Sequence, residues 1–430
     1  MTFPQVKFKR VLDRNDGGTW GDDPVGSGNT VVLRSTEQTA DGRWAIKEPE
    51  LRFVAPQEAE RYLLRKGDLL ITKSSGSALH IGKTTIVDST VANLRAIYSN
   101  FMQRVRLSGN ESPKYFWYVL RTPWIREQWV LNSTSTTGLA NLNADSIGQL
   151  LVPHPPLDEQ RQIAEYLDRE TGKIDELIAK QEQLVATLTE RRQAVIAQAV
   201  ARGLDPTAES KNTGFSWLGE VPAHWVVTSL GRRIDVLTGF PFKSDKFSSD
   251  DGQTRLLRGV NINPGTTAWR DVVYWVREPG DGLDEYSLAE DDIVLGLDRP
   301  LVSSGTRVAR IVGSDLPSLL LQRVARIRPT RGAFGPYLLL LLSGQIFHDY
   351  LSPIFTGVSV PHMSPEQLRK FVVAFPPEAE QQEIASFIAV ETRQINRLIA
   401  KAREMIALLR ERRAALISAA VTGKIDARGL

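Results

Sequence analysis

A ten-residue stretch that begins with two prolines decides the fold, because the chain contains it twice. Residues 155–164 read PPLDEQRQIA, and residues 376–385 read PPEAEQQEIA. The alignment of the two copies continues without a gap to Asp205 and Asp426, and nearly half of the aligned positions are identical. Self-similarity at a fixed period is the signature of a repeated structural unit. We therefore expect an internal duplication with pseudo-two-fold symmetry.

Each copy predicts one long helix. Proline does not fit inside a helix, so the helices start after the proline pairs. Apolar residues then recur at steps of three, four or seven, which is the period of one helix face. They are Ile163, Leu167, Ile174, Leu177, Ile178, Leu184, Leu188, Val195 and Ala199, and then Ile384, Ile388, Ile395, Leu398, Ile399, Met405, Leu409, Leu416 and Ala420.

One apolar face per helix requires a partner helix. The other copy can supply it, so residues 151–205 and 376–430 are expected to form an antiparallel helix pair or coiled coil. Helices of another subunit are an alternative partner. A helix of about 40 residues rises about 60 Å, which suits a spacer.

The segments that precede the two helices also correspond, although more loosely. Val32-Leu33-Arg34 aligns with Leu256-Leu257-Arg258. Short strand-like runs such as 68–72 and 293–297 alternate with helix-like runs, so both segments are predicted to be similar compact α+β domains. The predicted order is a domain at 1–150, a helix at 151–205, a linker at 206–224, a domain at 225–375 and a helix at 376–430. Glycine and proline punctuate the linker.

Composition excludes several classes of protein. The chain has no cysteine, which excludes disulfides, thiolate metal sites and cysteine nucleophiles. Five isolated histidines lack metal-ligand spacing, so no metal site is expected. The longest apolar run is far shorter than the roughly 20 residues that span a bilayer, so we expect a cytoplasmic protein without membrane contact. The formal net charge is +3. Only residues 1–150, at about +4, are distinctly basic.

Several motifs, taken together, resemble the specificity subunits of type I restriction-modification systems over essentially the whole chain. They are the duplicated proline-pair segments, KGDLLI at 66–71, WLGEVPAHW at 217–225 and VTGKID at 421–426. The N-terminus lacks the WLGE-type opening that precedes the second domain, which leaves only the first domain boundary open.

The resemblance implies a function and a set of partners. In that family each domain is a target-recognition domain, and the helices are conserved regions that bind modification subunits. The chain would then read a bipartite, asymmetric target in double-stranded DNA. Its partners would be two DNA-methyltransferase subunits and, in the nuclease form, restriction subunits that translocate and cut DNA. No cofactor is expected on this chain, whereas S-adenosylmethionine, ATP and Mg are expected on the partners.

Candidate DNA-binding residues are the donors and acceptors in loops, because base edges and phosphates are recognised by such groups. A single basic surface residue is more often only solvated, so the loops count as groups. In the first domain the candidates are Arg34, Arg43, Lys73, Ser74, Ser75, Ser77, Lys83 and Thr84. In the second they are Arg255, Arg258, Arg299, Ser303, Ser304, Arg307, Gln322 and Arg323.

Candidate partner-binding residues lie on the predicted helices, although charged pairs on a helix usually belong only to its solvent-exposed face. They are Glu159, Gln160, Arg191, Arg192, Glu380, Gln381, Arg412 and Arg413.

Three alternative functions remain open at the level of sequence. The first is an enzyme, either a DNA methyltransferase or a nuclease, but no methyltransferase, nucleoside-loop or nuclease motif is found, so a non-catalytic subunit is expected. The second is a structural coiled-coil adaptor. The third is a specificity subunit of a related restriction class with a fused methylase and nuclease. The helices repeat closely while the domains diverge, as expected if the domains read different half-sites.

Overall fold

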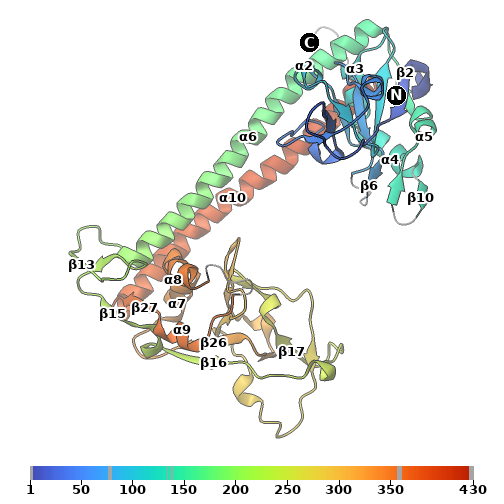
Figure 1. Ribbon diagram of the computed structural model, residues 1–430. Coiled ribbons are helices and arrows are strands. Elements are labelled where there is room, and N and C mark those ends of the chain that lie inside the picture. The colour runs from blue at the N-terminus through green and yellow to red at the C-terminus, as the bar shows by residue number, and fades with distance from the viewer. Residues whose placement is uncertain (1–2, 76–79, 133, 137–138, 356–360, 426–430) are drawn as a thin grey trace. The chain divides into compact units, whose positions relative to one another are not determined.

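The computed structural model describes residues 3–75, 80–132, 134–136, 139–355 and 361–425. The chain divides into two units, each containing one half of the helix pair. The first unit comprises Met1–Gln183 and Arg403–Leu430, and the second comprises Leu184–Ala402. Each unit mixes sheets and helices around buried apolar cores, which confirms the α+β class (Figure 1).

The first unit is built on an antiparallel four-stranded sheet in the order β2-β9-β5-β7, beside a mixed three-stranded sheet in the order β4-β3-β8. These strands are β2 (Leu12–Gly17), β9 (Met102–Leu107), β5 (Leu69–Thr72), β7 (Thr84–Ile86), β4 (Glu50–Arg52), β3 (Thr30–Leu33) and β8 (Ile97–Tyr98). The smaller pairings use β1 (Gln5–Lys7), β12 (Leu151–Pro153), β6 (Ser74–Ser75), β10 (Thr134–Thr136) and β11 (Leu139–Asn141).

The second unit repeats the topology of the four-stranded sheet and of the mixed three-stranded sheet. Its four-stranded sheet has the order β16-β26-β21-β24, and its three-stranded sheet has the order β20-β17-β25. These strands are β16 (Ile234–Thr238), β26 (Val324–Pro329), β21 (Ile293–Gly296), β24 (Val308–Arg310), β20 (Tyr274–Trp275), β17 (Thr254–Leu257) and β25 (Ser318–Leu320). The other strands are β15 (Val226–Ser229), β27 (Val372–Phe375), β18 (Ile262–Asn263), β19 (Thr266–Thr267), β22 (Leu301–Val302) and β23 (Gly305–Thr306).

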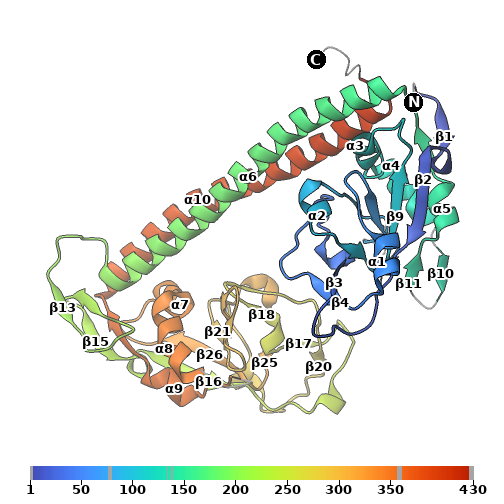
Figure 2. The ribbon, with the colours of Figure 1, turned by 45° about the horizontal axis from the view of Figure 1, so that its top comes forward.

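Three short helices follow each four-stranded sheet. They are α3 (Pro113–Val119), α4 (Pro123–Asn132) and α5 (Ala144–Gly148) in the first unit, and α7 (Gly335–Ser343), α8 (Gln345–Phe355) and α9 (Pro365–Lys370) in the second. The first unit also contains α1 (Pro56–Tyr62) and α2 (Ser89–Asn93). Figure 2 shows α5 beside β2, and α8 and α9 near β16 and β26.

The two long helices are α6 (Leu157–Arg202) and α10 (Glu378–Val421). They lie side by side in both views (Figures 1 and 2). In the first unit Asp175 of α6 pairs with Arg413 of α10, and Glu182 pairs with Arg410. Residue numbers therefore increase along one helix where they decrease along the other, as in an antiparallel pair. In the second unit Leu188 packs against Ile395 and Ile399. The predicted antiparallel helix pair is confirmed.

The predicted helix and linker ranges contain additional strands. Residues 151–153 form β12, which pairs with β1, because Pro153, Pro155 and Pro156 keep the helix from starting before Leu157. The predicted linker 206–224 contains an antiparallel hairpin of β13 (Ser210–Asn212) and β14 (Glu220–Pro222). The linker therefore carries regular structure of its own.

A buried tyrosine in each unit joins the domain to the end of a long helix. Tyr115 donates to the carbonyl oxygens of Pro153 and Val421, at 3.2 and 3.1 Å. Tyr337 donates to those of Ala374 and Val200, at 3.5 and 3.3 Å. The last carbonyls of a helix lack partners within the helix, so each phenol satisfies one of them. Each domain thus holds the end of the helix that does not directly follow it.

Within the described residues, no single helix is long and apolar enough to cross a membrane. Helices α7 and α8 together have the length and apolar composition of a membrane span, but the pair is bent by 47° and packs into the main core of the second unit.

Candidate nucleic-acid interface

In the first unit, the chain just beyond β5 meets two other segments at one edge. The Lys73 N–H donates to the Phe101 carbonyl at 3.0 Å, and the Lys73 carbonyl accepts from the Leu142 N–H at 2.7 Å. Ser74 pairs with Asn141 across β6 and β11. We name this edge, formed by Lys73, Ser74, Ser75, Phe101 and Asn141, the first rim.

The second unit builds the same edge with the same backbone contacts. The Leu297 N–H donates to the Arg323 carbonyl at 2.9 Å, and the Leu297 carbonyl accepts from the Met363 N–H at 2.8 Å. Asp298 pairs with His362 in a β-bridge. Leu297, Asp298, Arg299, Arg323 and His362 form the second rim, and each is the repeat equivalent of one residue of the first rim.

The two rims share a backbone scaffold but carry different side chains. Where the first rim has Ser74, Asn141 and the half-exposed ring of Phe101, the second has Asp298, His362 and Arg323. Both rims are therefore built alike and would offer different hydrogen-bonding groups to a ligand.

Asp298 organises the second rim. One of its carboxylate oxygens contacts His362 Nδ1 at 2.7 Å, and the other accepts from Arg323 Nη1 at 2.7 Å. Burial acts to raise the pKa of Asp298, but the hydrogen bonds from Arg323 and His362 outweigh it and hold the pKa below its usual value. The same contact raises the pKa of Arg323. The cluster thus presents a fixed cation and an oriented imidazole at an exposed edge.

Backbone strain gathers at the second rim. Arg299 has a φ of 46° and Arg323 a φ of 65°, both in the left-handed region that side chains other than glycine rarely adopt. The Arg299 N–H donates to the Pro361 carbonyl at 2.7 Å, which holds the first of these residues in place. Strained residues often mark sites of function.

The candidates of the first domain fall into different environments. Lys73, Ser74 and Ser75 lie on the first rim, and burial lowers the pKa of Lys73. Ser77 lies outside the described residues. Arg34 is bound to the carboxylates of Glu37 and Glu50, while Arg43 is bound to Asp41 and to Asp175 of α6.

Two candidates of the first domain need correction. Lys83 Nζ donates to the carbonyls of Ser35 and Gln38, both at 2.9 Å, and burial lowers its pKa. Thr84 is buried, and its hydroxyl donates to the Gly82 carbonyl. Thr84 is buried in β7 and is therefore not available to DNA, whereas Lys83, which directly precedes β7, is half-buried with its ammonium held by two backbone carbonyls.

The candidates of the second domain also separate into exposed and internally bound groups. Arg299, Ser303, Ser304, Gln322 and Arg323 are exposed, the two serines at the tip of the β22–β23 hairpin. Arg307 is half-buried beside Gly296. Arg255 donates to two backbone carbonyls and lies over the Trp269 ring, and Arg258 binds Asp271. These last two arginines stabilise loops of the domain.

Two of the helix candidates are corrected by their burial. The amide of Gln160 accepts from the Ser112 N–H and donates to Glu111 and to the Pro155 carbonyl. Gln381 makes the matching contacts with the Phe334 N–H and with the carbonyls of Gly332 and Pro376. Both side chains are buried, so no surface remains through which a partner could reach them.

The charged helix candidates differ in exposure. Arg413 binds Asp175, and Arg192 binds Asn396 at the repeat-equivalent place, so both bridge the helix pair. Glu380 binds His224 and Trp225, and Glu159 is half-buried. Arg191 and Arg412 are exposed.

The sequence analysis missed five residues of the rims, namely Phe101, Asn141, Leu297, Asp298 and His362. An acidic residue and an aromatic ring do not match the donor pattern used for the search. The signal that could have found them is the repeat itself, because positions that keep the offset and change residue type mark divergent sites.

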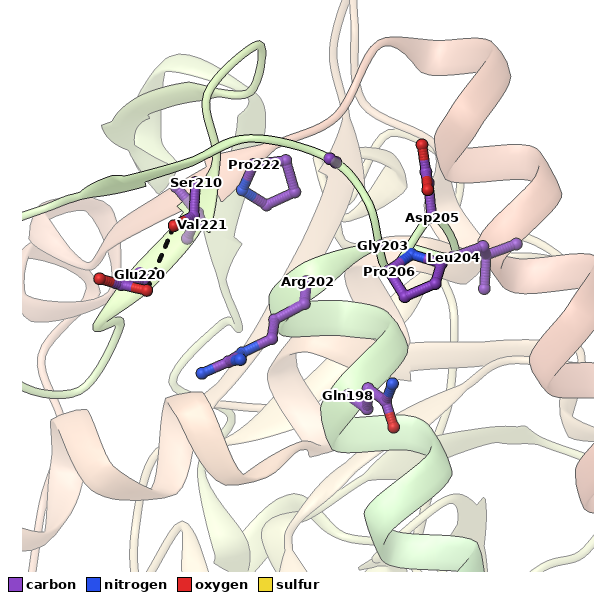
Figure 3. A pocket seen from close by; sticks show the side chains of 11 residues that line it. Gln198, Arg202, Gly203, Leu204, Asp205, Pro206, Ser210, Glu220, Val221 and Pro222 are labelled. Carbon is purple, nitrogen blue, oxygen red and sulfur yellow. Dashed lines mark hydrogen bonds between the residues drawn. The ribbon is translucent and has the colours of Figure 1, made fainter.

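A surface cavity of about 390 Å³ lies in the second unit between the end of α6 and the β13–β14 hairpin. Figure 3 shows Arg202 extending into this space from the last turn of the helix, with Ser210 hydrogen-bonded to Glu220 at 3.2 Å on the hairpin. Among the residues that the structure describes, no group of three or more histidine, aspartate or glutamate side chains could hold a metal ion.

Comparison with known proteins places these features in context. Residues 27–186 match the model of the type I restriction modification DNA specificity domain. The chain is 25% identical over 374 residues to the type I restriction enzyme MjaVIII specificity subunit of Methanocaldococcus jannaschii, which covers 86% of this chain and 81% of that one. It is 38% identical over 168 residues to the EcoAI specificity subunit of Escherichia coli, covering 39% and 28% of the two chains.

Two solved structures share the fold. One, described as the structural basis of complex assembly and conformational transition of the type I R-M system, superposes with a TM-score of 0.74 at 17% identity, over 99% of this chain and 100% of that one. The HsdS subunit of Thermoanaerobacter tengcongensis superposes with a TM-score of 0.53 at 18% identity, over 98% and 97%.

Proposed function

The chain belongs to the specificity subunits of type I restriction-modification systems, and from that premise we propose that its two rims read the two halves of a split DNA target. The observation that carries the proposal is the duplicated scaffold. The backbone contacts of Lys73 and Leu297 are equivalent, while the side chains around them differ. A shared scaffold with unequal side chains suits one chain that recognises two unequal half-sites of one duplex.

The chemistry of each rim supports base reading. Arginine donates in pairs to guanine, and asparagine pairs with adenine, in the major groove. The second rim offers Arg299, Arg323 and His362, and the first offers Asn141 with the exposed ring of Phe101. The nearby serines suit phosphate contacts, which set position and carry no sequence information themselves.

Exposed apolar positions on the long helices support partner binding. In the first unit Leu177 and Met405 are exposed, and in the second unit Leu398 and Leu184 are exposed, each between 43 and 51%. The repeat relates Leu177 to Leu398 and Leu184 to Met405. Exposed apolar residues mark interaction sites, and two equivalent pairs of them, here called patches, suit two copies of one partner. We assign them to two modification subunits.

Catalysis is assigned to those partners. We propose that the chain itself is non-catalytic and binds no cofactor, that the modification subunits carry S-adenosylmethionine, and that restriction subunits, where present, carry ATP and Mg. The absence of cysteine and the proposed role on DNA support a cytoplasmic location.

Genomic methylation mapping by single-molecule sequencing, with and without this gene, tests the proposal. We expect a split motif with adenine modified on opposite strands, which disappears when the gene is removed. An unbroken palindrome, or an unchanged methylation pattern, would contradict the proposal.

Variants of the second rim sharpen this test. Removal of a base-contacting arginine typically costs about 1–3 kcal/mol of binding free energy. Arg323→Ala should therefore weaken binding of the intact DNA target about tenfold and reduce sequence specificity in only one half of the motif. Arg310→Ala is the matched control, because Arg310 is an exposed arginine of the same unit that pairs with Asp291 away from the rim. If the two variants weakened binding equally, the second rim would not be part of the recognition site.

A further inference from the structure

A second cavity lies in the first unit, and none of the residues that line it belongs to the first rim. Its volume is about 330 Å³, and its lining includes Lys83, Arg121, Arg126 and Trp129 together with the backbone of Gly82. The lining contains three residues of the lysine and arginine type and one histidine, but no aspartate or glutamate among the described residues. The described lining of the cavity is therefore cationic and includes no carboxylate.

Two buried donors at this cavity lack an acceptor among the described residues. They are Arg121 Nη1 and Trp129 Nε1. Trp129 is only 1% exposed, and a Cβ added at Gly82 would lie 2.6 Å from its indole nitrogen, so glycine permits this close approach. Buried donors without acceptors cost free energy, and a native structure with two of them at one cavity calls for an explanation.

The position of Arg121 is set by its neighbours. Its guanidinium lies 4.2 Å from the centre of the Trp117 ring, whose indole N–H donates to the Gly42 carbonyl at 3.2 Å. A Cβ added at Gly42 would lie 2.7 Å from Arg121 Nε. Burial, and then the charge of Arg413, lower the pKa of Arg121 to about 10. Burial and the charge of Arg413 thus disfavour the charged form of this half-buried side chain, and Asp41 offsets only part of that effect.

The charges of the other arginines nearby are already matched. Arg413 binds Asp175, and Arg410 binds Glu182. The remaining cations at the cavity are held by backbone oxygens, since Lys83 donates to two carbonyls and Arg126 to that of Ile81. Arg121 remains the cation without a described hydrogen-bond partner for its buried nitrogen.

We propose that this cavity binds a phosphate-class oxyanion, with Arg121 and Trp129 as donors to its oxygens. Arginine presents a planar set of N–H groups that matches the oxygens of phosphate, and a charged acceptor strengthens each hydrogen bond. The source of the oxyanion is either phosphate in solution or a phosphate of the DNA backbone. The proposal does not require that the rims read bases.

The site is specific to the first unit. Tyr115 and Tyr337 are equivalent by their contacts and fix the local alignment of the two units. In that alignment Arg121 corresponds to Ser343 and Trp129 to Leu351, which offer neither the cation nor the indole donor. The second unit therefore serves as an internal control, because it has the same fold at this place but lacks both donors.

The test measures phosphate binding by the full chain with isothermal titration calorimetry and thermal shift, against sodium chloride of equal ionic strength. We expect saturable binding of one phosphate and a rise in Tm. Arg121→Met should weaken binding at least tenfold, and Trp129→Phe, which removes the N–H donor together with part of the ring, should weaken it less. Arg10→Met is the matched control, because Arg10 is an exposed arginine of the same unit, and it should bind as the wild type does.

The stability of Arg121→Met in phosphate-free buffer separates a binding role from a structural one. Removal of a half-buried cation whose buried Nη1 lacks an acceptor should leave its Tm equal to or above that of the wild type, whereas loss of a structural arginine should lower it. Displacement of phosphate by a duplex of unrelated sequence identifies the backbone as the source, and independent binding identifies phosphate in solution. No saturable binding, equal binding by Arg121→Met, or equal binding of succinate would overturn the proposal.

Discussion

The buried glutamine at the start of each long helix gives the sharpest prediction about stability. Gln381 makes three hydrogen bonds: it accepts from the Phe334 N–H at 2.8 Å and donates to the carbonyls of Pro376 and Gly332 at 2.9 and 3.0 Å. A hydrogen bond of this kind contributes about 0.5–1.5 kcal/mol net. Gln381→Ala should therefore reduce the free energy of local opening around the start of α7 by about 2–4 kcal/mol.

Amide hydrogen exchange measured by mass spectrometry checks this locally, without requiring that the whole chain unfold in one step. Since about 1.4 kcal/mol is a factor of ten, protection of peptides covering residues 329–340 should fall about 30- to 1,000-fold. Gln382→Ala is the matched control, because Gln382 is the next residue of the helix and is exposed. Gln160→Ala should act in the same way on the start of α3. If Gln381→Ala exchanges like Gln382→Ala, the hydrogen bonds carry no net stability and the reasoning fails.

Two further predictions concern the long helices. Asp175→Asn removes the carboxylate that binds Arg413 and recreates the arginine–asparagine pair that the second unit has at Arg192 and Asn396. We expect the free energy of local opening of α10 in the first unit to fall by about 1 kcal/mol at low salt, measured as lower hydrogen-exchange protection. At high salt, where the charges of the wild-type pair are screened, the difference between variant and wild type should disappear. Replacing Leu177 and Leu398 together by glutamate should abolish association with the modification subunits in size-exclusion chromatography while both units keep their circular dichroism, and unchanged association would exclude these patches as the contact.

The long elements of this fold were predictable because their signals are local and duplicated. The proline pairs fix where α6 and α10 can begin, and the apolar period fixes the face of each helix that is buried. The predicted range 151–205 still missed β12, because a three-residue strand owes its existence to its pairing with β1, which lies at the opposite end of the domain in the sequence. Local pattern does not encode that contact.

The candidate site was predicted less well than the fold, for a physical reason. Lys83 and Ser74 both belong to a short polar run, yet one side chain turns inward to two carbonyls and the other lies on the rim. Which of the two happens depends on distant segments that supply the acceptors. Residue type alone also hid Asp298, since its role is to orient a cation and an imidazole, and a search for donors passes over it.

The tyrosine contacts also bear on how the polypeptide matures. The first unit includes residues 403–425 at the end of α10. Tyr115 donates a hydrogen bond to the Val421 carbonyl there, and the side chains of Ile417, Ala420 and Val421 complete the core of the first unit. A nascent chain emerging from the ribosome therefore carries its first domain with an unfilled hydrophobic surface until nearly all of the described chain has been translated. The second unit, drawn from one continuous segment, can assemble earlier, so the domain made first is the one finished last.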